Sequence, residues 1–122
     1  MSDLLALKKD IIKKFGTPCA VVDLNVLEKN ISRVQKICDN AGLSNRPHIK
    51  THKSGEVARM QIDAGASGVT CQKLGEAEVM AAAGITDILI ATNLLGAAAS
   101  GALAALQSRI SLKVCADNTY SI

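Results

Sequence analysis

Short, nearly continuous apolar runs alternate along the chain with longer segments in which apolar residues recur every three or four positions. Runs of the first kind are typical of strands covered on both faces, and segments of the second kind are typical of amphipathic helices. The pattern predicts strands at 19–24, 46–52, 68–72, 87–92 and 110–116. It predicts helices at 3–14, 25–40, 54–64, 74–83 and 97–107. This alternation favours parallel strands joined by helical crossovers, which places the chain in the α/β class.

Capping residues mark where several of these helices begin. Asp3 and Ser54 are expected to cap the first and third helices, because short polar side chains accept hydrogen bonds from the free N–H groups of a first turn. Asn25 and Glu28 have the spacing of a capping box at the start of the second helix.

Two folds are compatible with the alternation. An open, doubly wound sheet is one, although the glycine fingerprint of dinucleotide-binding folds and the phosphate-binding loop are both absent from the sequence. The other is a closed barrel of eight strands, which typically needs about 250 residues. The 122 residues of this chain would supply about five of those strands, a partial (β/α)8 barrel.

Composition narrows the classes of function. Apolar residues make up 48% of the chain, which predicts a folded core, and aromatic residues only 2%, which argues against a platform that stacks nucleic-acid bases. The net charge of +3 is dispersed, so we expect no nucleic-acid partner. No signal peptide or membrane-spanning run is predicted. Four cysteines without a C-x-x-C pair favour reduced thiols in a cytoplasmic protein and argue against a zinc site.

The segment from Arg46 to Lys53 contains both histidines of the protein. Alternation along a strand would place Arg46, His48, Lys50 and His52 on one face. Burying such a face is costly unless it holds something, and a lysine crowded in this way can act as a nucleophilic amine. The usual carbonyl partner of such an amine is pyridoxal phosphate, bound as a Schiff base. A solvated edge strand, or a basic patch for phosphates, explains the local pattern equally well.

Three segments carry a resemblance to a known family. They are Thr17-Pro18 followed by Val21-Val22-Asp23, then Arg46 to Lys53, then Gly68 to Lys73 with Glu76-Ala77-Glu78. The chain resembles the amino-terminal part of the pyridoxal-phosphate enzymes of the alanine-racemase barrel type, also called fold type III. It is most similar to the branch of D-threonine aldolase, 3-hydroxy-D-aspartate aldolase and metal-dependent D-serine dehydratase. The resemblance extends over nearly all of residues 1–122, and it implies the partial TIM-type barrel rather than the open sheet.

The resemblance also implies roles for particular residues. Lys50 would carry the cofactor as a Schiff base, with Lys53 lying past the strand. Gln72, at the carboxyl end of the third strand, would touch the cofactor. His48 and His52 share the predicted face of Lys50, so each is a candidate for the active-site wall, either as a participant in the reaction or as a hydrogen-bonded wall residue.

The function that the resemblance implies is that of a pyridoxal-phosphate lyase in D-amino acid metabolism. It would cleave a small D-configured 3-hydroxy amino acid between Cα and Cβ in a retro-aldol reaction. A divalent metal (manganese, magnesium or zinc) is implied for the full-length enzyme, with no ligand in this chain, and so is a homodimer. We expect the remaining barrel strands and a carboxy-terminal β domain to be missing from residues 1–122, and this part alone to be inactive.

Two alternatives remain. A D-serine dehydratase of the same fold would release ammonia from its substrate, and its distinguishing residues would lie beyond position 122. The other alternative is a truncated remnant without catalytic function, which binds through its exposed strand edges.

Overall fold

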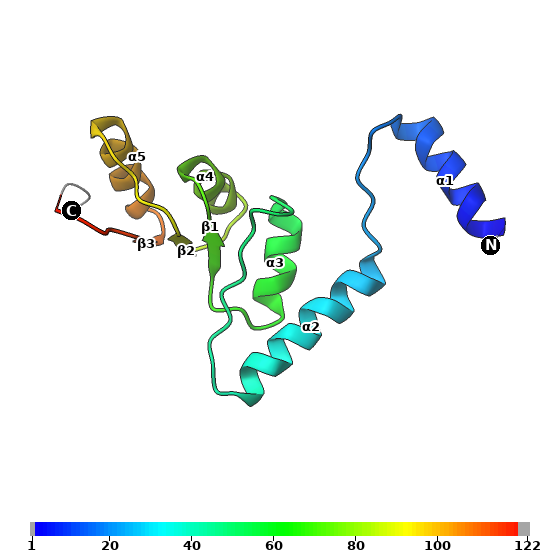
Figure 1. The fold of residues 1–122 in the computed structure, drawn as a ribbon, viewed down its shortest axis with the longest axis horizontal. Helices are drawn as coiled ribbons and strands as arrows, with labels where there is room; N and C mark the ends of the chain where they lie inside the picture. Colours follow the sequence, from blue (N-terminus) through cyan, green and yellow to red (C-terminus); the bar gives the residue numbers. More distant parts are fainter. Residues whose placement is uncertain (1, 120–122) are drawn as a thin grey trace.

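The computed structural model describes residues 2–119 as five helices and three strands, drawn in Figure 1. In chain order these are α1 (Ser2–Phe15), α2 (Leu24–Asn40), α3 (Gly55–Asp63), β1 (Val69–Cys71), α4 (Leu74–Ala82), β2 (Asp87–Ile90), α5 (Ala97–Gln107) and β3 (Ser111–Val114). All five predicted helices are therefore confirmed, with ends that differ from the predicted ones by at most one residue. Of the five predicted strands, the last three are confirmed in shortened form.

The three strands form one parallel sheet in the order β1-β2-β3. Ile88 of β2 pairs with Val69 on one side and with Leu112 on the other. Each strand is joined to the next by a helix, α4 or α5, as the alternation of the sequence predicts. The chain thus has an α/β fold with a parallel sheet, consistent with part of a barrel wall.

The predicted strand 46–52 is wrong over most of its length. Only His48 forms a bridge, parallel to Thr70 of β1. The backbone N–H of Ile49 donates to the Thr70 carbonyl at 2.9 Å, and the Thr70 N–H donates to the Pro47 carbonyl at 2.8 Å. The chain then turns at 50–52, because it must reverse before Ser54 caps α3 by accepting from the Val57 N–H at 3.3 Å.

The predicted strand 19–24 is also wrong. The segment has no strand partner among the described residues, and Val21 is 64% exposed. The segment 47–49 occupies the edge of β1 away from β2, and residues 19–24 form no bridge to it. The Asp23 side chain accepts from the Val26 N–H at 3.1 Å and caps α2, so the expected cap residue, Asn25, lies inside the helix.

The core lies between the sheet and the helices that follow its strands. Ile49, Val69, Cys71, Ile88 and Ile90 are fully buried on this side. They belong to one cluster with Ala58, Ala77, Met80, Ile85 and Leu106. The alternate residues Thr70, Asp87 and Lys113 belong to the opposite face of the sheet. One face of the sheet is therefore apolar and covered by helices, whereas the other carries polar groups.

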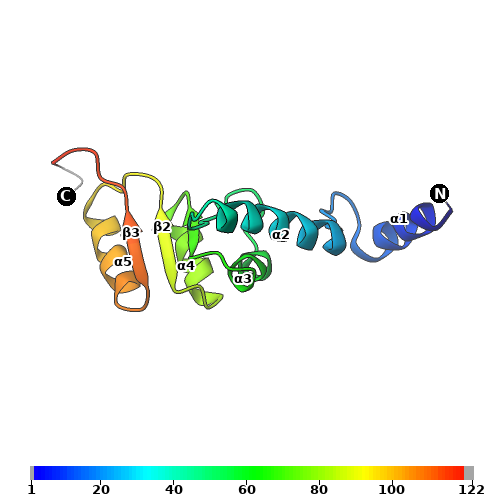
Figure 2. The same cartoon turned by 90° about the horizontal axis from the view of Figure 1, so that it is seen from below.

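Helices α1 and α2 extend away from this body and give the molecule an elongated shape (Figures 1 and 2). The buried Gln35 connects α2 to the body: its Nε2 donates to the Gly65 carbonyl at 3.2 Å, and its Oε1 accepts from Asn45 Nδ2 at 3.1 Å. Within residues 2–119, no helix combines the length and the hydropathy that a membrane crossing requires.

Gly68 is expected to tolerate no side chain. A Cβ atom there would lie 2.5 Å from the Asp87 carbonyl oxygen and would overlap the Arg46 guanidinium. We expect Gly68→Ala to lower the free energy of unfolding by about 1–3 kcal/mol, measured by urea denaturation, because overpacking forces the backbone apart. Gly101→Ala is the matched control, since nothing lies within 4 Å of an added Cβ in α5. Equal stability of the two variants would contradict the prediction.

Candidate functional site

Parallel strands bring their carboxyl ends to one edge of the sheet, where catalytic residues of such folds gather. Lys50 lies two residues beyond His48, and Gln72 lies two residues beyond Thr70, its bridge partner. Both residues therefore emerge at the same edge, from neighbouring segments of backbone. The structure brings together these two predicted site residues, which are 22 positions apart in the sequence.

Lys50 is exposed and lies in a tight turn. The backbone N–H groups of His52 and Lys53 both donate to the Ile49 carbonyl, at 3.2 and 2.8 Å, and this closes the turn. The Lys50 N–H donates to Nδ1 of His48 at 3.2 Å. His48 thus supports the backbone of Lys50, while the Lys50 side chain remains accessible.

Lys53 ends the turn, and it differs from Lys50 in its backbone conformation and in its side-chain contact. Its φ of 49° lies in the left-handed region, which is uncommon for residues other than glycine. Its Nζ lies 3.1 Å from Oε1 of Glu76. This ion pair engages the Lys53 amine with Glu76, whereas Lys50 lies exposed in the turn. Lys53 does lie past the extended segment, as expected.

His52 does not share a face with Lys50, because the turn ends the strand-like alternation. Its Nδ1 accepts from the Ser54 N–H at 3.1 Å, next to the start of α3. Burial lowers its pKa, and the nearby amide of Gln61 opposes this effect. His52 Nε2 and Gln61 Oε1 are both buried without a hydrogen-bond partner of good geometry among the described residues. Burial therefore disfavours the protonated form of His52, whose Nδ1 is engaged at the start of α3.

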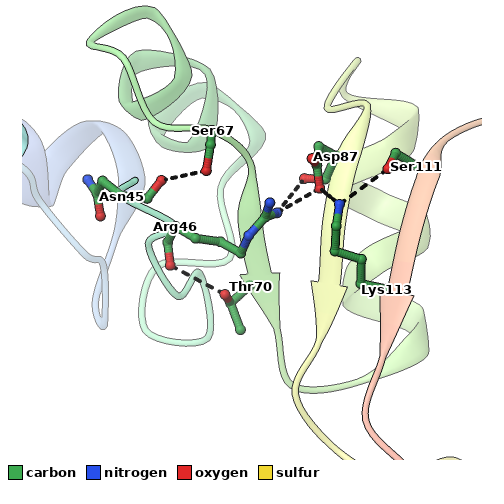
Figure 3. Close-up of polar contacts among 7 residues, drawn as sticks. All are labelled: Asn45, Arg46, Ser67, Thr70, Asp87, Ser111 and Lys113. Carbon is green, nitrogen blue, oxygen red and sulfur yellow. Dashed lines mark hydrogen bonds and ion pairs between the residues drawn. The ribbon is translucent and has the colours of Figure 1, made fainter. Parts of the chain in front are cut away.

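Arg46 is likewise separated from Lys50. Its Nη1 lies 2.7 Å from Oδ1 of Asp87, and Lys113 Nζ contacts the same oxygen at 2.7 Å (Figure 3). Lys113 also donates to the Ser111 hydroxyl at 3.3 Å. The hydrogen bond from Arg46, then that from Lys113, holds the pKa of Asp87 below its ordinary value. This group, the Asp87 cluster, lies where β2 begins, at the amino-terminal edge opposite Lys50. The predicted basic face is thus divided between the two edges of the sheet.

Glu76 also belongs to this site, although the sequence analysis assigned it no role in the site. It is the third residue of α4, and its Oε2 accepts from the Gln72 N–H at 2.8 Å. That hydrogen bond, assisted by Lys53, lowers the pKa of Glu76 despite the opposing effect of burial. The available signal was its spacing, since a Glu three positions after the N-cap Lys73 resembles half of a capping box.

The described residues do not support catalysis by a Cys71 nucleophile or a metal site. Burial, together with the charge of Glu76, raises the pKa of the Cys71 thiol to about 11, so this cysteine is not a nucleophile at neutral pH. Within residues 2–119 there is no group of three His, Cys, Asp or Glu side chains that could hold a metal ion.

A parallel sheet joined by helical crossovers, with an accessible lysine in a turn at the carboxyl ends of the strands, is consistent with part of a (β/α)8 barrel. The sequence comparison agrees with it, because residues 22–119 match the family described as alanine racemase, N-terminal domain. The chain belongs to this family.

Its relatives include enzymes that act on D-amino acids. The chain is 37% identical over 113 residues to a D-threonine aldolase of Arthrobacter sp., a match that covers 93% of the chain and 30% of the aldolase. It is 48% identical over 86 residues to the D-threo-3-hydroxyaspartate dehydratase of Delftia sp. (strain HT23), covering 70% of the chain and 23% of the dehydratase. Among solved structures, the D-threonine aldolase of Filomicrobium marinum superposes with a TM-score of 0.84 at 39% identity, covering 86% of this chain and 28% of that one. The chain thus spans less than a third of these relatives.

Proposed function

We propose that residues 1–122 are the amino-terminal part of a pyridoxal-phosphate-dependent lyase, which cleaves D-configured 3-hydroxy amino acids between Cα and Cβ. The observation that carries this proposal is the exposed Lys50 in a braced turn at the carboxyl edge of the sheet. The match of the chain to a D-threonine aldolase, which covers 93% of the chain, favours the retro-aldol reaction. The other strands of the barrel would come from sequence outside these 122 residues.

The residues of this chain provide some, but not all, of the groups that a pyridoxal-phosphate site requires. Lys50 offers a primary amine, and Gln72 offers an amide at the same edge of the sheet. When bound, pyridoxal phosphate supplies an aldehyde for the lysine and a ring that accepts the electron pair of the broken bond. The phosphate group would need binding loops from other strands. His48 and Glu76 hold the backbone on either side of the amine, and the buried Ile49 fixes the start of its turn.

A divalent metal belongs to the proposal only through residues outside the described part. Its chemical use would be to polarise the β-hydroxyl of the substrate. The proposal also includes a homodimer and a cytoplasmic location, and the latter agrees with four cysteines that are all free of disulfides.

The second candidate is a dehydratase, favoured by 48% identity to the Delftia enzyme over a shorter stretch. This reaction would remove the α-proton and expel the β-hydroxyl instead of breaking the Cα–Cβ bond. Both reactions begin with the same lysine. The residues of this chain that we describe at the site serve either one.

The test uses a hybrid in which this chain replaces the matched region of the Arthrobacter D-threonine aldolase. We expect borohydride to fix pyridoxal phosphate on Lys50, as read by peptide mapping, because Lys53 is held by Glu76. Lys53→Met should leave the label on Lys50. A label on Lys53, or none on this chain in a hybrid that folds, would overturn the proposal.

A further inference from the structure

We propose that Glu76 is a positioning residue, whose single carboxylate joins the turn of Lys50 to the backbone at Gln72. The inference deepens the proposed function and rests on it for the identity of the ligand. The joining itself stands on contacts within this chain.

Two different oxygens of Glu76 make the connection. Oε2 accepts from the Gln72 N–H at 2.8 Å, where the chain leaves β1. Oε1 lies 3.1 Å from Lys53 Nζ, where the turn of Lys50 ends. The carboxylate therefore bridges two segments that the sequence separates by 19 positions, and it does so from a third element, α4.

The surroundings make this bridge stronger than an ordinary surface ion pair. The side chain of Glu76 is only 10% exposed, although that of Lys53 is 60% exposed. The hydrogen bond to a backbone N–H involves a charged acceptor, which makes it stronger than a neutral one. It also satisfies an amide just ahead of α4, whose N-cap residue Lys73 makes no side-chain cap bond.

The backbone on the Lys50 side needs such support. Lys53 occupies the left-handed region with φ 49°, and residues other than glycine persist there when the surrounding structure holds them. The other hydrogen bonds of the turn run to the Ile49 carbonyl and, from the Lys50 N–H, to Nδ1 of His48. Releasing Lys53 from Glu76 therefore lets the turn relax, and Lys50 moves relative to Gln72.

The consequence is a change in cofactor binding rather than in the chemistry of Lys50 itself. We expect Glu76→Ala, in the hybrid described above, to raise the dissociation constant of pyridoxal phosphate about 10- to 100-fold, because misplacement of a positioned group costs rates and affinities of that order. Lys53→Met, which removes one of the two contacts, should have a smaller effect in the same direction. Glu78→Gln is the matched control, since it removes a carboxylate from the same helix at an exposed position.

A second readout needs no cofactor. Trypsin cleaves after lysine, so we expect Glu76→Ala to speed cleavage after Lys50 and Lys53 in the cofactor-free hybrid by at least about fivefold, because proteolysis follows the opening of a segment. Glu78→Gln should leave this rate unchanged. Cleavage in a distant loop of the same protein separates local opening from general loss of stability.

The outcomes distinguish the two proposals. Faster cleavage in a hybrid that does not bind pyridoxal phosphate at Lys50 would support the bridge and overturn the proposed function. Normal binding and normal cleavage in Glu76→Ala would overturn the bridge and leave the proposed function in place. Faster cleavage with unchanged affinity would make Glu76 a structural residue only, which contradicts the positioning role.

Discussion

Lys50→Ala is expected to reduce release of acetaldehyde from D-threonine by at least about a thousandfold in the hybrid enzyme, because removal of a covalent nucleophile leaves only the contribution of binding. Lys50→Arg should be as inactive, since a guanidinium stays protonated and does not condense with an aldehyde. The rate is measured by a coupled aldehyde assay, and the loss of covalently held cofactor by its absorbance.

Lys53→Arg provides the control for this experiment. It keeps a positive charge within reach of Glu76, so we expect most of the activity to remain. A variant at position 50 that kept its activity while a variant at position 53 lost it would reverse the assignment of the two lysines.

The second large effect is expected at Asp87. Asp87→Asn removes the charge that Arg46 and Lys113 share, and it leaves these two cations close together without a carboxylate. The three side chains are partly exposed, so solvent screens the loss. We expect the free energy of unfolding at pH 7 to fall by about 1–2 kcal/mol, because a hydrogen bond to a charged group contributes about 1.5–3 kcal/mol and solvent screening lowers this. Asp63→Asn is the control, because this exposed aspartate lies at the end of α3.

The pH dependence identifies the cause of this loss. The folded chain lowers the pKa of Asp87 below its ordinary value of 3.8, chiefly through the Arg46 hydrogen bond. A lowered carboxyl pKa contributes stability above the unfolded pKa, and this contribution is lost as the pH falls through the folded value. The difference between wild type and Asp87→Asn should therefore be largest near neutral pH and shrink below about pH 4. Urea midpoints at a series of pH values measure it, and a difference that does not change with pH would contradict the ion-pair explanation.

Local signals predicted the helices and the shortened strands because they act over a few residues. Ser54 caps α3 as its side chain and position indicate. The run that contains Ile88 and Ile90 is buried as expected of a central parallel strand. The segments 19–24 and 46–52 differ, because the chain turns at 50–52 ahead of α3 and because 19–24 pairs with no described strand. That depends on the tertiary arrangement, which no local pattern records.

The same distinction applies to the site. Lys50 and Gln72 could be selected from their sequence motifs, and the sheet places both at one edge. The alternation of side chains did not predict the separation of Arg46 from Lys50. It assumes a strand that continues through residue 52, whereas the chain turns after Ile49. Glu76 contributes through a contact with Lys53 that only the docking of α4 creates.

The Asp87 cluster has a consequence for which substitutions the sheet tolerates. It holds the beginnings of β2 and β3 and the segment before His48 together by charge, far from the edge that carries Lys50. Substitutions in the loops at the carboxyl edge therefore leave this part of the folding energy intact. The contacts that hold this end of the sheet are thus separate from those that shape the turn of Lys50.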